Sequence, residues 1–449
     1  MSPLDLIFER MRAAGTKTAI IEDGGTVTSY ADLLTLVEGQ AKLCAAAGIG
    51  AGASVQLRAD FGRDGIASLL ALLRLRAIVT PVAPTSFEKA EEFAEVAEVG
   101  HIVDAAAGTI VATGRRSDHI LLEELRGKGH PGVIIFTSGT TGASKGAVHD
   151  ATRLLSKFET PGKDLVTLAF LLFDHIAGVD TLFYCLSNAS TIVATPDRTP
   201  ENVLRLMART SVEVLPTAPS FLNLMMLSGA HAAHDLSSLK IVTYGAETMP
   251  ASLLARLAET FPGVKLVQKF GTSEIGALKS KSESNSSLWL SLGREGEVWR
   301  ISEDGLLELR SKTTMMGYLN APSPFTEDGW YRTGDRIERR DDGMVRILGR
   351  DSDMINLGGQ KVFPAEVENA LRQVPGVIEA SVFGRPHPIM GALVCARIRL
   401  SQSDFVPAEA RATIKRALQG RLEPYKIPQR IELTDEALTT ARFKQRRTG

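Results

Sequence analysis

A stretch rich in glycine and hydroxyl groups, with one lysine, is the part of this sequence best suited to chemistry. It reads TSGTTGASKG from residue 137 to 146, directly after the apolar run Val133–Phe136. Glycine allows backbone conformations closed to other residues, so successive N–H groups can converge on an anion. The hydroxyl groups add donors and Lys145 adds positive charge. The pattern indicates a strand that leads into a phosphate-binding loop, and hence a protein that handles a nucleotide.

The loop differs from the common nucleotide-binding pattern GxxxxGK followed by Ser or Thr. Here Lys145 follows Ser144 and is followed by Gly146, which disfavours a switch or motor ATPase. Taken alone, the stretch could also be a solvated connection between two elements.

Four later segments, in order, contain aromatic, acidic and basic residues beside glycines. They are Tyr244–Glu247 (YGAE), Phe270–Glu274 (FGTSE), Tyr331–Asp335 (YRTGD) and Gly349–Glu368 (GRDSDMINLGGQKVFPAEVE). Together with the loop, they resemble the adenylate-forming superfamily of acyl- and aryl-CoA ligases, peptide synthetase adenylation domains and beetle luciferases. The resemblance spans residues 137 to 368, and a weaker match near Lys444 extends it almost to the C-terminus. Five matches in order are not expected by chance.

The resemblance implies an acid–thiol ligase that uses ATP and Mg²⁺. Such an enzyme joins a small carboxylic acid to AMP, releases pyrophosphate, and then forms a thioester with CoA. Three alternatives stay open: loading of a carrier-protein phosphopantetheine, adenylation of another acid or oxyanion with a non-thiol acceptor, and a noncatalytic nucleotide-binding relative. The acid itself is not specified. Its pocket is expected from mostly apolar segments, which favours an aromatic or medium aliphatic monoacid; these are Leu172–Val179, Pro216–Leu222, Gly245 and Gly271–Leu278.

The resemblance also implies roles for single residues. Glu274 would bind magnesium with Thr140 as a hydroxyl ligand, because Mg²⁺ prefers oxygen donors; a helix-start carboxylate is the alternative. Asp335 would accept hydrogen bonds from both ribose hydroxyls, and Arg350 would assist at ribose or phosphate; a turn aspartate and a surface ion pair are the alternatives. Adenine would lie along Gly245, Ala246 and Glu247, with Phe270 as a stacking face or simply a core residue. The other implied nucleotide contacts are Thr137, Ser138, Gly139, Thr141, Gly142, Lys145, Gly271 and Thr272.

Lys444 corresponds to the lysine that promotes adenylation in the family, although Phe443 stands where relatives have glycine. A solvated basic tail is the alternative. Ser352 takes the hinge position about which the small domain rotates. Rotation would replace the lysine-bearing face by one that admits the thiol and carries Gly358, Gly359 and Lys361. His175, in FDHIAG, resembles the gate between acid pocket and thiol tunnel, or else is a core or sheet-edge histidine.

Composition bounds the class of protein. With 449 residues, 44% of them hydrophobic, the chain can bury a large core in two to four domains or subdomains. A formal charge of −1 gives no overall field for a nucleic acid or an anionic membrane. Three isolated cysteines suit a reducing compartment. No secretory signal is expected at the N-terminus, and charged residues interrupt the apolar stretch Leu165–Leu186, so the expected location is the cytoplasm. The oligomeric state is not specified.

The pattern of elements predicts an α/β fold. Short apolar runs alternate with amphipathic segments between residues 130 and 274, which is typical of parallel sheets covered by helices. Expected strands there include Val133–Phe136, Ile241–Tyr244 and Val264–Gln268. Asp-Gly turns after residue 292 indicate antiparallel hairpins. We therefore expect a large N-terminal AMP-binding domain, 1–350, with a β subdomain at about 292–350, followed by a small mobile α+β domain, 351–449.

Overall fold

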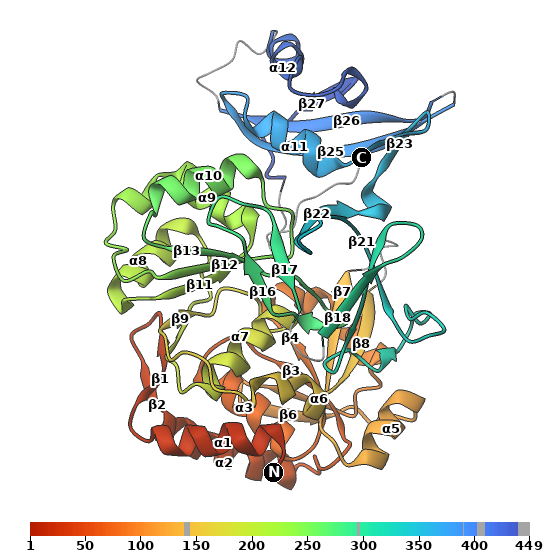
Figure 1. Ribbon diagram of the computed structural model, residues 1–449. Coiled ribbons are helices and arrows are strands. Elements are labelled where there is room, and N and C mark those ends of the chain that lie inside the picture. The colour runs from red at the N-terminus through yellow and green to blue at the C-terminus, as the bar shows by residue number, and fades with distance from the viewer. Residues whose placement is uncertain (139–143, 294–296, 389, 402–408, 439–449) are drawn as a thin grey trace.

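Two seven-stranded sheets form most of the N-terminal part of the computed structural model, which describes residues 1–138, 144–293, 297–388, 390–401 and 409–438 (Figure 1). The first sheet is parallel except at its last pair. Its order is β13 (Lys265–Gln268), β12 (Ile241–Tyr244), β11 (Val214–Thr217), β9 (Thr167–Leu168), β10 (Ile192–Ala194), β1 (Thr18–Glu22) and β2 (Val27–Ser29). The expected strands Ile241–Tyr244 and Val264–Gln268 are confirmed as β12 and β13.

The second sheet mixes parallel and antiparallel pairs. Its order is β20 (Gly317–Tyr318), β8 (Ser144–Asp150), β7 (Gly132–Ser138), β4 (Ile78–Val82), β3 (Ser54–Arg58), β5 (His101–Asp104) and β6 (Thr109–Ala112). The expected strand Val133–Phe136 lies in β7, which pairs with β4 in parallel and with β8 in antiparallel orientation. The sequence pattern did not separate this strand from those of the first sheet, because the polar start of β8 hides the returning strand.

Helices cover both sheets, and apolar side chains fill the space between them. The helices of this part are α1 (Pro3–Ala14), α2 (Tyr30–Ala46), α3 (Arg63–Arg74), α4 (Ala90–Val96), α5 (Ile120–Lys128), α6 (Ala151–Leu155), α7 (Ile176–Ser187), α8 (Pro200–Thr210), α9 (Pro219–Ser228) and α10 (Ala251–Thr260). Ser2 and Asp5 form a capping box that begins α1, and Ser29 and Asp32 do the same for α2. Within the described ranges, none of the helices combines the length and apolar character that crossing a lipid bilayer requires.

A six-stranded antiparallel sheet follows in the chain. Its order is β16 (Ser280–Ser282), β17 (Leu290–Leu292), β22 (Val345–Arg350), β21 (Tyr331–Arg339), β19 (Leu306–Ser311) and β18 (Glu297–Ile301). It thus includes two strands N-terminal to residue 292, where the change of pattern was expected. The predicted turns Asp304-Gly305 and Asp342-Gly343 join β18 to β19 and β21 to β22, and both glycines have the positive φ that such turns favour.

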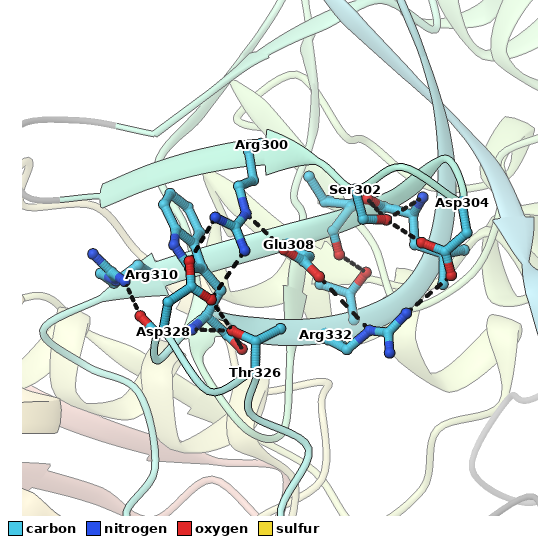
Figure 2. Close-up of polar contacts among 12 residues, drawn as sticks. Arg300, Ser302, Asp304, Glu308, Arg310, Thr326, Asp328 and Arg332 are labelled. Carbon is cyan, nitrogen blue, oxygen red and sulfur yellow. Dashed lines mark hydrogen bonds and ion pairs between the residues drawn. The ribbon is translucent and has the colours of Figure 1, made fainter.

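Charged pairs across neighbouring strands hold one face of this sheet together (Figure 2). Glu308 on β19 is buried, and it faces Arg300 on β18 and Arg332 on β21 in the strand register. Its carboxylate lies 2.7 Å from the Arg300 guanidinium and 3.6 Å from that of Arg332. Arg300 also pairs with Asp328 at 2.7 Å, and its guanidinium stacks on the Trp330 ring. Opposite charges placed directly across strands stabilise such a sheet.

The C-terminal unit has its own sheet and its own apolar core. The sheet contains β24 (Gln360–Val362), β23 (Ile355–Leu357), β26 (Gly391–Leu400) and β25 (Val377–His387), with β27 (Arg430–Leu433) parallel to β26. Helices α11 (Pro364–Arg372) and α12 (Ala410–Leu418) contribute to its core. This unit lies beyond the end of β22 in Figure 1, in blue. The α/β fold class with a large sheet-based part and a small α+β part is confirmed.

Candidate active site

Two of the sequence motifs leave the same sheet edge side by side. β12 ends at Tyr244 and β13 at Gln268, and these two residues are partners in the parallel register. Carboxyl ends of parallel strands form the ligand-binding edge of an open α/β sheet. A Cβ on Gly245 would lie 2.6 Å from the carbonyl oxygen of Lys269, so only glycine fits this close approach. The next residue, Ala246, has φ +67°, a left-handed conformation that is strained for alanine.

The turn after β12 is fixed from α9. Glu247 accepts hydrogen bonds from the backbone N–H of Ser220, at 3.1 Å, and from the Ser220 hydroxyl. Ser220 lies in the first turn of α9, where backbone N–H groups have no partner within the helix. The Glu247 side chain therefore fixes the turn relative to α9.

The β21–β22 hairpin brings an acid and a base together. Asp335 and Arg350 are register partners, and their side chains form an ion pair at 2.9 Å. Asp335 is 6% exposed. Burial raises the pKa of Asp335 to about 6, although the positive charge of Arg350 acts to lower it. Arg350 also donates to the Thr333 carbonyl at 3.2 Å, so both groups are held in place.

One cavity of about 450 Å³ joins these two features with the C-terminal unit. Six of the residues expected to contact the nucleotide line it: Ala246, Glu247, Phe270, Gly271, Asp335 and Arg350. Phe270 also packs in the core of the antiparallel sheet, and its stacking role stays a prediction. From the C-terminal unit, Phe363, Arg372 and Leu438 complete the wall. Gly245 and Thr272 lie next to lining residues rather than on the wall itself.

Glu274 is a buried carboxylate surrounded by hydroxyl groups. It accepts a hydrogen bond from the Tyr318 hydroxyl, and its backbone N–H donates to the Thr272 hydroxyl at 3.3 Å. Burial raises the pKa of Glu274, but hydrogen bonds from Tyr318, Thr272 and Tyr331 lower it by more, and the net pKa lies below the usual value. Among the described residues Glu274 has no cationic partner. It is an ionised carboxylate whose side-chain hydrogen-bond partners are neutral hydroxyl groups.

One end of the expected phosphate loop lies near Tyr318, which binds this carboxylate. Thr137 pairs with Lys145, and Ser138 with Ser144, at the end of the β7–β8 hairpin. The Lys145 ammonium lies 5.5 Å from the centre of the Tyr318 ring, whose hydroxyl binds Glu274. Gly139, Thr140, Thr141 and Gly142 lie outside the described residues.

The expected hinge and thiol-side residues lie in the C-terminal unit. Ser352 is in the short 3₁₀ turn η4 (Asp351–Asp353) between β22 and β23. Gly358 and Gly359 turn the chain from β23 to β24, both with positive φ, and the exposed Lys361 is on β24. With Ser352, the two glycines line a second cavity of about 560 Å³. By contrast Leu438, six positions before Lys444, lines the first cavity. Lys444 itself lies outside the described residues.

His175 caps α7 and does not line either cavity. Its Nδ1 accepts from the Ala177 backbone N–H at 3.2 Å. This geometry is that of a histidine at the start of a helix, not of the core or sheet-edge residue expected as the alternative. The gate role stays a prediction.

Three residues of this region were not predicted. Gln268 and Lys269 directly precede the FGTSE motif and line the cavity. Gln268 is 8% exposed, and its buried Oε1 has no partner among the described residues. Their position before the motif was the available signal. Tyr318 is separated from Glu274 by 44 positions in the chain and carries no local signal.

Comparison with known families matches both parts of the chain. Residues 122–319 match the model of the AMP-binding enzyme family, and residues 366–444 match that of the AMP-binding enzyme C-terminal domain. In the described part of the chain, no three His, Cys, Asp or Glu side chains are grouped as a metal site.

Similar proteins cover most of the chain. Indoleacetate–CoA ligase of Aromatoleum aromaticum is 27% identical over 93% of this chain and 92% of its own. The medium/long-chain-fatty-acid–[acyl-carrier-protein] ligase FadD10 of Mycobacterium tuberculosis is 28% identical over 99% and 94%. The fatty acid–[acyl-carrier-protein] ligase MmaC of Mycobacterium marinum is 30% identical over 77% and 73%. The crystal structure of the anthranilate CoA ligase AuaEII with anthranoyl-AMP has the same fold, with a TM-score of 0.81, 20% identity, and coverage of 100% and 96%.

Proposed function

The chain belongs to the AMP-binding enzyme family of adenylate-forming ligases, and from that premise we propose that it joins a carboxylic acid to AMP and then to the thiol of CoA. The observation that carries the proposal is the 450 Å³ cavity lined by the Glu247 turn, Phe270, Asp335 and Arg350. A turn, an aromatic ring and a fixed carboxylate on one wall suit adenine and ribose together.

The nucleoside half of ATP takes the part of the cavity between β12 and β21. Adenine lies along the 245–247 turn against the Phe270 ring. The unpartnered Oε1 of Gln268 accepts a hydrogen bond from the exocyclic amine of adenine, because an amide oxygen is an acceptor and an amine is a donor. Asp335, held by Arg350, accepts from the ribose hydroxyls. Binding of these donors stabilises the ionised form of Asp335, whose pKa burial raises in the ligand-free protein.

The reaction brings two anions together, the acid's carboxylate and the triphosphate. Lys145 and the loop 137–146 hold the phosphates. Glu274 fits a magnesium ligand, because it is ionised, buried and without a cationic partner among the described residues; Thr140 is proposed as a second ligand. A bound Mg²⁺ would neutralise phosphate charge during the displacement of pyrophosphate. Tyr318 and Thr272 keep the Glu274 carboxylate oriented toward that site.

The two halves of the reaction need different faces of the C-terminal domain. We divide the chain at 350/351, with Ser352 as the hinge. Lys444 would approach the α-phosphate and the acid's carboxylate during adenylation; support for this comes from Leu438, which lies at the cavity. The Gly358–Gly359 turn and Lys361 do not line the 450 Å³ cavity, and rotation about Ser352 would bring them to the site for thiol attack.

The nearest alternative acceptor is the phosphopantetheine of an acyl carrier protein. FadD10, which matches 99% of this chain, is named for such an acceptor, whereas indoleacetate–CoA ligase is named for CoA. Both acceptors present the same thiol arm, so the adenylation half of the proposal is common to them.

Acid-dependent exchange of labelled pyrophosphate into ATP tests the first half. We expect exchange with at least one member of a panel of aromatic and aliphatic acids, and thioester formation when CoA is then added. A phosphopantetheinylated carrier protein in place of CoA tests the alternative. ATP binding without exchange for any acid would contradict the proposal and favour a noncatalytic relative.

A further inference from the structure

Lys269 is a lysine on the cavity wall without a counter-ion. It follows β13 directly, and its backbone N–H donates to the Tyr244 carbonyl at 2.7 Å, which fixes its position. The residue lines the 450 Å³ cavity, and its ammonium makes no ion pair or hydrogen bond with the described part of the chain. A cation held in a partly buried site without a partner is costly unless a ligand supplies one.

The acidic group that acts on Lys269 already forms an ion pair with another lysine. Asp180 on α7 pairs with Lys157 at 2.6 Å, and both side chains are more than nine-tenths buried. The same carboxylate oxygen accepts from the Ala277 backbone N–H at 2.7 Å. Gly276 packs closely against this pair, because a Cβ at this position would lie 3.1 Å from the Lys157 ammonium. Asp180 therefore neutralises Lys157, and within the group of Lys157, Asp180 and Lys269 one positive charge is left on Lys269.

The chain around Lys269 leads to the segments of the expected acid pocket. Burial lowers the pKa of Lys269; Asp180 opposes this, whereas Lys157, Lys265 and Lys279 add to it. Only Phe270 separates Lys269 from β14 (Gly271–Thr272), which pairs with β15 (Gly276–Ala277), and α7 packs against β15. These segments overlap those from which the sequence predicts the acid pocket.

We propose that Lys269 determines substrate specificity by pairing with a second carboxylate on the acid, so that the preferred substrates are dicarboxylic acids activated at one end. This inference rests on the proposed ligase function and replaces the expectation of a plain monoacid. An apolar chain in the same place would leave the ammonium without a partner in the complex, whereas a second carboxylate supplies the missing charge and the hydrogen-bond acceptors.

Matched acid pairs in the pyrophosphate exchange assay test the inference. Each pair consists of a monoacid and the α,ω-diacid of the same chain length, such as butanoate with succinate and hexanoate with adipate. For at least one pair, the wild-type protein is expected to show kcat/KM at least about 10-fold higher for the diacid. Lys269→Met keeps the length and removes the charge; it should lower this ratio by a similar factor and raise the efficiency with the monoacid. Lys269→Arg should retain the preference.

Lys265→Met is the control, because Lys265 is an exposed lysine on the same strand. It should leave the diacid-to-monoacid ratio at the wild-type value. A wild-type preference for monoacids in every pair overturns the inference, and this outcome requires no variant to fold. Equal losses for both acids in Lys269→Met also overturn it, because the lysine would then act on the reacting carboxylate or on ATP. Absence of exchange with every acid overturns the proposed ligase function itself, and the inference with it.

Discussion

Replacing Asp335 by asparagine is expected to stabilise the ligand-free protein at pH 8 and to weaken ATP binding. The pKa of Asp335 rises from 3.8 to about 6 in the folded protein, a difference of about 2 units. At about 1.4 kcal/mol per unit, ionised Asp335 costs up to about 3 kcal/mol of folding free energy. Its side chain is 9% exposed, so solvent screens little of this cost. Asparagine keeps an oxygen for Arg350 and removes the charge.

The sign of the pH dependence follows from the raised pKa. The folded protein binds this proton more tightly than the unfolded chain does, so the stabilising contribution is full below about pH 4 and is lost as the pH rises through about 6. Urea unfolding of Asp335→Asn and of wild type from pH 5 to 8 measures this dependence. The free energy of unfolding of the variant should exceed that of wild type by an amount that grows with pH. ATP affinity should fall by about 10- to 100-fold, because charge-assisted hydrogen bonds to ribose are lost.

Asp328→Asn is the control for this experiment. Asp328 is an exposed residue in the same part of the chain, and the hydrogen bonds that it accepts from Arg300 lower its pKa to about 2. The contribution of ionised Asp328 to folding stability is present above about pH 4 and is lost at lower pH, which is the opposite pH dependence to that of Asp335. The Asp328→Asn variant should bind ATP like the wild type. A stability difference for Asp335→Asn that is constant from pH 5 to 8, or a variant less stable than wild type at pH 8, would refute the reasoning.

Three further substitutions test other parts of the site. Tyr318→Phe removes the hydroxyl that lowers the pKa of Glu274, so the acid limb of the pH–rate profile for pyrophosphate exchange should move to higher pH; an unchanged limb would contradict the role of Tyr318. Lys444→Ala should lower adenylation by at least about 100-fold while thioester formation from a supplied adenylate continues, and equal loss of both steps would contradict the assignment. Gly245→Ala places a methyl group 2.6 Å from the Lys269 carbonyl and should destabilise the protein by about 1–3 kcal/mol in thermal unfolding, whereas Gly263→Ala, with no atom within 4 Å, should not.

The sequence predicts well those parts of the site that are encoded locally. Gly245–Glu247 and Phe270–Gly271 each follow a short apolar strand, and YRTGD lies on one strand of a hairpin, so each motif carries its own structural context. Asp335 and Arg350, 15 positions apart, become neighbours simply because the Asp342-Gly343 turn folds that hairpin.

Contacts between distant segments could not be predicted in the same way. Tyr318 reaches Glu274 because β20 pairs with β8, and a strand of two residues gives no sequence pattern that predicts this pairing. The pairing of Asp180 with Lys157 requires α7 to pack beside η2 (Ser156–Phe158), and it decides that Lys269 has no counter-ion. Sequence inspection therefore described an apolar acid pocket, because it could not assign partners to single charges.

The most direct test of the central claim is to identify the product formed on the protein without an acceptor. Purified protein is incubated with ATP, Mg²⁺ and a panel of monoacids and diacids, quenched, and analysed by mass spectrometry, with Asp335→Asn as the comparison. The account predicts an acid–AMP anhydride in stoichiometric amounts together with pyrophosphate, and less of both in the variant. Cleavage of ATP to ADP and phosphate, or ATP binding with no acid-dependent product, would contradict it.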